Sequence, residues 1–143
     1  MNRRYIMLGG GGIVALALIA VWQTRSPNQQ IPSESGNGGA IVAVLSPPVE
    51  GNAAIGKQIF ESACAACHGV NAVGTKGVAP PLIHKTYEPS HHGDEAFQRA
   101  AALGVKSHHW PFGDMPPVQG LTRGDVAMIV TYIRELQRAN GIL

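Results

Sequence analysis

The sequence predicts an all-α domain of about three main helices, preceded by one N-terminal transmembrane helix. Three segments carry apolar residues at helical spacing, no segment shows the alternation typical of a strand, and residues 6–22 form an almost uninterrupted apolar run. A chain of 143 residues allows one ordinary domain plus an anchoring or targeting segment, but it is short for two independent cores.

The N-terminal apolar run follows Arg3 and Arg4 and is bracketed by Tyr5 and Trp22. As a helix, residues 6–22 would extend about 25 Å at ~1.5 Å per residue, which is the lower limit for crossing a hydrocarbon core of roughly 30 Å. The basic end is expected to stay in the cytoplasm, so the rest of the chain lies on the far side of the membrane. The alternative is a cleaved signal peptide, which also exports the domain. We therefore expect residues 1–24 to be a membrane anchor or a signal.

Residues 25–48 are rich in Ser, Asn, Gln, Gly and Pro, and this composition predicts a flexible linker. A short apolar interruption from Ala40 to Leu45 fits either a brief strand or a segment that docks on the domain. Residues 49–143 form the predicted soluble domain.

The first helix of this domain is expected from an N-cap at Asn52 to about Ala65. Its apolar face carries Ile55, Ile59, Phe60 and Ala63. Gly56 lies on the same stripe, where glycine costs roughly 1 kcal/mol relative to alanine. A glycine at such a position suggests that another helix approaches closely.

Two further helices follow. The second is expected from a cap at Asp94 through Leu103, with Gly104 as its stop signal. The third begins at Thr122, with Asp125 three residues on as a capping box, and ends near residues 140–141. Its apolar stripe consists of Val126, Ile129, Val130, Ile133 and Leu136, flanked by Tyr132. With 6% aromatic residues, such a domain needs a cofactor to complete its core.

Charge and cysteine content exclude two classes of protein. The formal net charge is +2, and the excess lies in the N-terminal region, because basic and acidic residues balance after residue 46. A nucleic-acid-binding module is therefore not expected. The chain has 2 Cys, which can form at most one bridge, so a disulfide scaffold is excluded.

Both cysteines lie in Cys64-Ala65-Ala66-Cys67-His68, which is the attachment signature of a c-type haem. On one side of a helical turn, Cys64 and Cys67 can form thioethers to two vinyl groups, while His68 reaches the iron. A redox dithiol would require a βαβ setting, and a zinc site would require two more ligands at matching spacing. Haem attachment is the interpretation that also uses the histidine.

Two proline-containing stretches extend the predicted haem site. In the first, the carbonyl of Pro80 is a rigid acceptor for the second ring nitrogen of His68, and Leu82 can pack on the haem ring. In the second, residues 110–117, Met115 is presented by a proline-stiffened loop and is the candidate sixth ligand of the iron. Met128, the other methionine of the domain, is expected to be packing filler.

With these residues the chain resembles a class I, monohaem cytochrome c of the short bacterial kind that is often tethered by an N-terminal helix. The resemblance covers about residues 52–140 and rests on Cys64, Cys67 and His68, on Gly77, Pro80 and Leu82, on Met115 with the prolines after it, and on a crossing of the first and last helices in which Gly56 and Phe60 meet Tyr132. It implies the cytochrome c fold, one covalent haem c, His68 and Met115 as axial ligands, and Trp110 near a haem propionate.

The histidine-rich middle of the domain departs from the family pattern. A rival sixth ligand could come from His84, His91, His92, His108 or His109. Imidazole also suits copper and other transition metals, but adjacent residues rarely coordinate one ion well. The sequence therefore favours loop histidines near the haem pocket or its propionates, with metal binding as the alternative.

The resemblance implies an electron carrier rather than an enzyme. The expected partners are a quinol-oxidising complex or a dehydrogenase as donor and a terminal oxidase as acceptor, with no nucleic acid and no small-molecule substrate. The expected location is the bacterial inner membrane, single-pass, with the haem domain in the periplasm; the alternative is a soluble periplasmic protein after signal cleavage. Two other functions stay open: a haem-c subunit of an oxidoreductase complex, or a haem sensor with a labile sixth ligand.

Overall fold

The computed structural model describes residues 39–143, so the predicted anchor and most of the predicted linker lie outside the described residues. The elements are the α-helices α2 (Gly51–Ala63), α3 (Ala65–His68), α4 (Asp94–Leu103) and α5 (Arg123–Ala139), and the 3₁₀ turns η1 (Val70–Ala72) and η2 (Lys85–Tyr87). Within residues 39–143, β pairing is limited to isolated bridges. None of the helices in this range is long and apolar enough to cross a membrane. The prediction of an all-α domain is confirmed.

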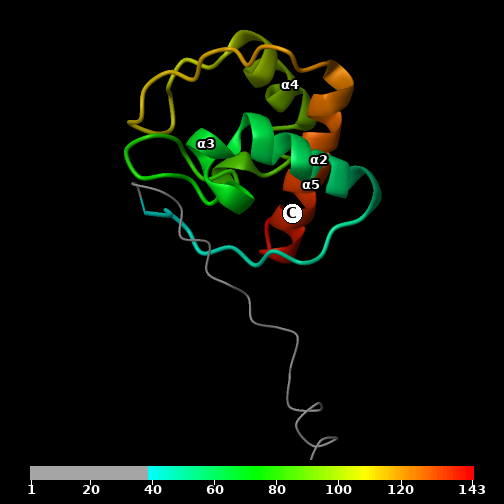
Figure 1. Ribbon diagram of the computed structural model, residues 1–143. Helices are drawn as coiled ribbons and strands as arrows, with labels where there is room; N and C mark the ends of the chain where they lie inside the picture. The colour runs from blue at the N-terminus through cyan, green and yellow to red at the C-terminus, as the bar shows by residue number, and fades with distance from the viewer. Residues whose placement is uncertain (1–38) are drawn as a thin grey trace, which may run out of the picture. The chain divides into compact units, whose positions relative to one another are not determined.

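The crossing of α2 and α5 is the main packing contact of the domain (Figure 1). A Cβ atom added at Gly56 would lie 1.9 Å from the backbone oxygen of Met128, so only glycine allows this approach. One turn further along α2, the fully buried rings of Phe60 and Tyr132 meet with centroids 5.8 Å apart. The close approach of another helix at Gly56 is confirmed.

Helix α5 begins with the predicted capping box. Thr122 accepts a hydrogen bond from the Asp125 backbone N–H, and the Asp125 carboxylate accepts one from the Thr122 backbone N–H. All five residues of the predicted stripe are buried, together with Tyr132. Helix α5 also buries the polar side chains of Arg134 and Gln137, and both donate hydrogen bonds to the Tyr87 carbonyl in the preceding loop region.

Three details of the prediction for α2 are wrong. Helix α2 begins at Gly51 with Glu50 as its N-cap, so Asn52 lies inside the first turn, and it ends at Ala63 because Cys64 leaves the helical conformation. Its buried face is centred on Gly56 at the crossing, which leaves Ile55 47% exposed.

The predicted cap of α4 is also wrong. The N-cap is Gly93, and Asp94 is the first helical residue. The Asp94 carboxylate does not cap its own helix because it accepts a hydrogen bond from Arg134 Nε at 2.9 Å. The predicted stop at Gly104 is confirmed, since this residue ends α4 with a φ of 75°.

The last part of the predicted linker lies against the domain. The backbone N–H groups of Ile41 and Val42 donate to the carbonyl of Val73, and Leu45 exchanges hydrogen bonds with the side chain of Asn140. Val44 packs against the core. Of the two alternatives for the apolar interruption, the docking segment is the one found.

Candidate functional site

The cysteine motif forms a short helical turn directly after α2. Cys64 has φ −122° and ψ −33°, which ends α2 and starts α3 in a new direction. The Cys64 carbonyl then accepts backbone hydrogen bonds from Cys67 at 3.2 Å and from His68 at 2.9 Å. Both thiols are free, as thioether formation requires.

The ring of His68 has one nitrogen fixed. Its Nδ1 lies 2.9 Å from the carbonyl oxygen of Pro80, and because a carbonyl only accepts, Nδ1 carries the proton. The turn that presents Pro80 is closed by two backbone hydrogen bonds between Thr75 and Ala79. Burial lowers the pKa of His68, and the hydrogen bond to Pro80 opposes this in part. His68 is therefore a neutral imidazole with Nε2 available for a metal.

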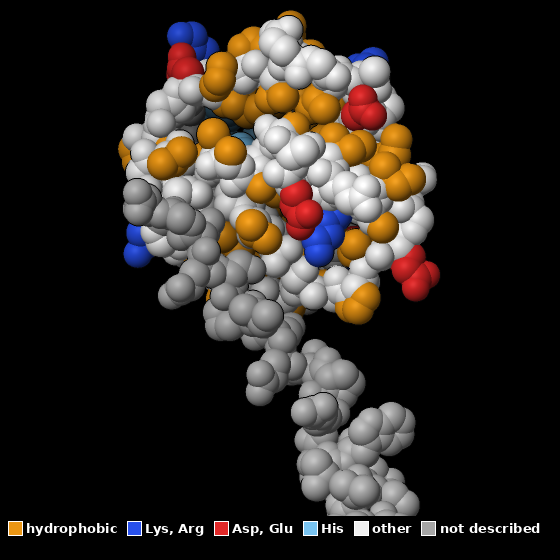
Figure 2. Space-filling model, in the orientation of Figure 1, with side chains coloured by type: hydrophobic (Ala, Val, Ile, Leu, Met, Phe, Trp, Pro, Cys, Tyr) orange, Lys and Arg blue, Asp and Glu red, His pale blue; other side chains and the backbone are white. Residues whose placement is uncertain are grey.

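A cavity of about 630 Å³ lies beside this histidine, within the roughly 300–1,000 Å³ of cofactor pockets. Its lining comes from the motif, from the loop between η1 and α4, from α4, and from the loop between α4 and α5. Figure 2 shows a hollow surrounded by hydrophobic side chains, with histidine side chains visible at its bottom. The predicted site residues that line the cavity are Cys67, His68, Pro80, Leu82, Trp110 and Met115. Cys64 is half-buried and packs against the core.

Met115 is held by its own loop. Its backbone exchanges hydrogen bonds with Val105, at 2.9 and 3.0 Å, so the loop from α4 to α5 is closed at its base. Asp114, for which the sequence indicates no role beyond turn formation, accepts from Lys106 Nζ at 2.8 Å and from the Ser107 backbone N–H at 2.9 Å. Both interactions lower the pKa of the Asp114 carboxyl. The sequence neighbour of Met115 thus reinforces the closure at the base of the loop.

Trp110 contributes an unsatisfied donor to the cavity wall. Its Nε1 is buried and meets no acceptor with hydrogen-bond geometry among the described residues, although its nearness to the Tyr87 hydroxyl opposes in part the rise that burial gives to the pKa of Tyr87. The ring stacks on Phe112 and meets the edge of His84, so its position is fixed from both sides. A buried N–H without a partner is costly, and an anionic group in the cavity would satisfy it.

The two histidine pairs converge beside the cavity. His92, His108 and His109 line it, and the Nε2 atoms of His91 and His109 lie 3.3 Å apart. The sequence predicts loop histidines near the haem pocket, and the structure places them there, with the two pairs brought together by a turn and a loop. The only indication of this cluster in the sequence is that the histidines occur as two adjacent pairs, and this pattern does not show which loops lie side by side.

Haem c fits this site on three observations. Both thiols and His68 share one short turn, the cavity has the size of a cofactor pocket, and Trp110 Nε1 is a buried donor suited to a propionate. Before haem is attached, the burial of Cys64 raises the pKa of its thiol to about 11, with a contribution from Cys67, so this thiol is protonated at neutral pH.

The family model of cytochrome c matches residues 53–137, which is more than half of the chain. No curated protein and no solved structure is significantly similar to the chain. The fold, the haem-attachment motif and this match agree: the chain belongs to the cytochrome c family. It carries covalent haem c, and its class is that of electron carriers, which are typically not enzymes and work with redox protein partners.

Proposed function

We propose that this protein is a one-electron carrier in which His68 and Met115 are the two axial ligands of the haem iron. The observation that carries the proposal is that both side chains line one cavity, and that His68 has Nδ1 committed to Pro80. When bound, haem c supplies a reversible one-electron couple between its ferrous and ferric states.

The residues around the site orient the two proposed ligands. The Pro80 carbonyl orients the imidazole of His68 and increases its basicity as a ligand. Asp114 restrains the loop of Met115 through Lys106 and Ser107. Ligation by a thioether together with a histidine would raise the reduction potential, which suits delivery of electrons to an oxidase. With His68 and Met115 as its ligands, the iron would have no free position for a substrate.

The proposed location is the periplasmic side of a bacterial inner membrane, with residues 1–24 as the anchor. The support is the sequence pattern of two arginines before an apolar run bracketed by aromatic residues. From there the domain would exchange electrons between a quinol-oxidising complex or dehydrogenase and a terminal oxidase. Fractionation tests this part: we expect the haem protein in washed membranes, and its recovery as a shortened soluble protein would favour signal cleavage.

Carbon monoxide added to the reduced protein tests the carrier function. A filled sixth position predicts no change in the optical spectrum. A rapid and complete change would contradict the proposal and would favour a haem sensor or a ligand-binding enzyme subunit. A redox titration followed optically then gives the potential, which we expect to lie in the high range of His/Met ligation rather than in the low range of bis-His ligation.

A further inference from the structure

Four histidines from two separate loops meet at the rim of the haem cavity. His91 and His92 belong to the turn after η2, and His108 and His109 to the loop after α4. The ring centroids of His91 and His109 are 5.1 Å apart, and those of His92 and His109 are 5.2 Å apart. His91 and His92 both reach the cluster although they are adjacent in sequence, because they lie in a tight turn. In this turn the Glu88 carbonyl accepts hydrogen bonds from the backbone N–H groups of both residues.

Three of these rings have the spacing of metal ligands. His91, His92 and His109 each offer a nitrogen, and the three nitrogens lie within 4.8 Å of one another. The Nε2 atoms of His91 and His109 are 3.3 Å apart. Two nitrogens bound tetrahedrally at ~2.0–2.1 Å from one ion are also about 3.3 Å apart, so this pair needs little movement to bind.

The second nitrogen of His92 is held as it is in natural metal sites. Its Nδ1 lies 2.7 Å from the Thr86 carbonyl, which places the proton on Nδ1 and leaves Nε2 as a free lone pair. His108 has the same arrangement with the Lys106 carbonyl at 2.7 Å, and its ring packs against His109 with centroids 4.3 Å apart. The rings are therefore oriented before any ion arrives.

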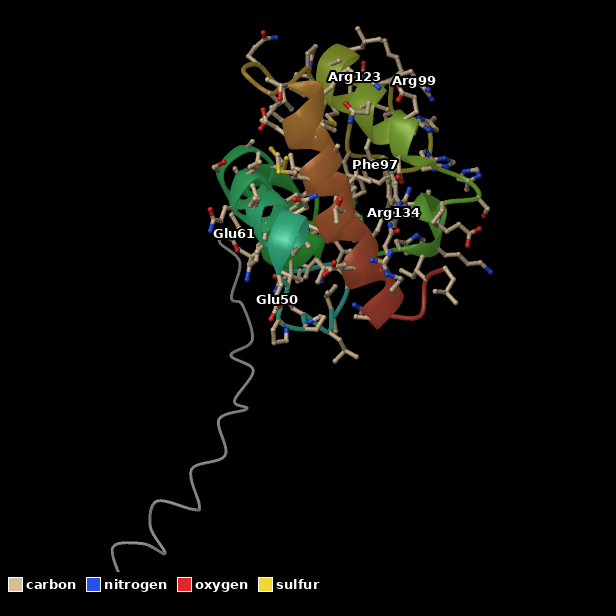
Figure 3. The ribbon with its side chains drawn as sticks, turned by 90° about the vertical axis from the view of Figure 1, so that its right-hand side faces the viewer. Glu50, Glu61, Phe97, Arg99, Arg123 and Arg134 are labelled. Atoms are coloured by element: carbon tan, nitrogen blue, oxygen red, sulfur yellow. The ribbon has the colours of Figure 1, made fainter. Side chains whose placement is uncertain are left out.

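Arg134 fixes the turn that carries His91 and His92. Its guanidinium lies over the ring of Phe97 at 5.0 Å, and the two side chains lie together between α5 and α4 (Figure 3). From there Arg134 Nη2 donates to the His92 carbonyl at 2.6 Å, and Nη1 donates to the Tyr87 carbonyl at 2.7 Å. Since Arg134 is buried, the histidine turn is anchored to the core.

We propose that His91, His92 and His109 form a binding site for a divalent transition-metal ion such as Zn²⁺ or Cu²⁺. The donor set consists of imidazoles only, which favours these ions over Mg²⁺ and Ca²⁺, whose ligands are oxygens. Three histidines leave a fourth position of a tetrahedral ion for water.

The site has a structural consequence for the haem pocket. His92 and His109 also line the cavity, and His109 belongs to the same loop as Met115. An ion bound here joins this loop to the turn after η2 and restricts the movement of both. Metal binding is therefore a means of stiffening the pocket wall that is independent of the haem ligands.

The test is a zinc titration of the full-length ferric holoprotein, prepared without an oligohistidine tag and freed of metal with a chelator. Zn²⁺ is redox-silent, and competition with a chromophoric chelator reports its affinity. We expect saturation at one equivalent. His91→Gln and His109→Gln, made separately, each lower the affinity at least about tenfold, because even loss of an outer partner of a metal ligand costs 10–100-fold.

His84→Asn is the matched control, because it removes a histidine outside the cluster and keeps a side-chain acceptor for the Thr86 N–H. We expect this variant to bind zinc as the parent does, and the haem spectrum verifies that each variant is folded. The proposal is overturned if the parent binds no zinc at micromolar concentration, or if both glutamine variants bind it with the parent's affinity. Neither result bears on haem ligation, which the optical spectrum reports separately.

Discussion

Substitution of Gly56 by alanine tests the packing on which the fold depends. The new Cβ would lie 1.9 Å from the Met128 oxygen, and Cβ contacts below 3.0 Å essentially do not occur, so α2 and α5 must separate by about 1.1 Å. Overpacking of this kind costs roughly 1–3 kcal/mol, and we take the upper end because the atoms met are backbone. Alanine has a higher helix propensity than glycine, which offsets about 1 kcal/mol of this cost. The expected net loss in the free energy of unfolding is about 2 kcal/mol.

The assay is thermal and urea unfolding of the ferric holoprotein. A loss of this size lowers Tm by roughly 8–16 °C in a domain of about 100 residues. Gly124→Ala is the matched control, since its Cβ would meet nothing closer than Thr122 Oγ1 at 3.6 Å, and we expect it to be neutral or slightly stabilising. A Gly56→Ala protein with unchanged Tm would refute the close crossing of the two helices.

Three further perturbations follow from the loops around the cavity. Arg134→Gln should lower the free energy of unfolding by about 3 kcal/mol, because the half-buried carbonyls of Tyr87 and His92 lose the buried guanidinium that donates to them. Urea unfolding measures this loss, and Arg123→Gln is the comparison, because its ion pair with Glu95 is exposed and should contribute little. Asp114→Ala should leave the free energy of unfolding nearly unchanged, but added imidazole should displace the sixth ligand of the ferric protein more readily, because the Met115 loop loses its hydrogen bonds to Lys106 and Ser107. Equal imidazole affinity in the variant and the parent would contradict this. The pKa values of His92 and His109 are both lowered, through desolvation and through the charges of the neighbouring histidines. In the holoprotein freed of other metals, the folded state therefore binds fewer protons than the unfolded state, and stability is full above the ordinary histidine pKa of 6.5 and is lost as the pH falls below it. A urea midpoint that increases as the pH is lowered from about 7 to about 5 would refute this sign.

The features that could be predicted from the sequence are those that depend on local spacing. The haem-attachment motif, the capping box at Thr122 and the stop at Gly104 each follow from residues within a few positions of one another. Gly56 could be interpreted because a glycine within an apolar stripe weakens its own helix, a cost that close packing of a second helix can offset.

The features that were missed depend on distant contacts. Ile55 has the spacing of a core residue, but the crossing at Gly56 turns the helix so that it is half-exposed. Asp94 has the sequence position of a cap, yet Arg134, 40 residues away, binds its carboxylate. The convergence of two histidine pairs likewise depends on how two loops fold onto one cavity, which no local pattern encodes.

The sulfur-to-iron charge-transfer band of the oxidised protein tests the central claim of His68 and Met115 ligation most directly. We predict that the parent shows this band, that Met115→Ala abolishes it, and that Met128→Ala and His109→Gln retain it, because neither removes the proposed ligand. A band that persists in Met115→Ala, or that is absent from the parent, would contradict this ligation.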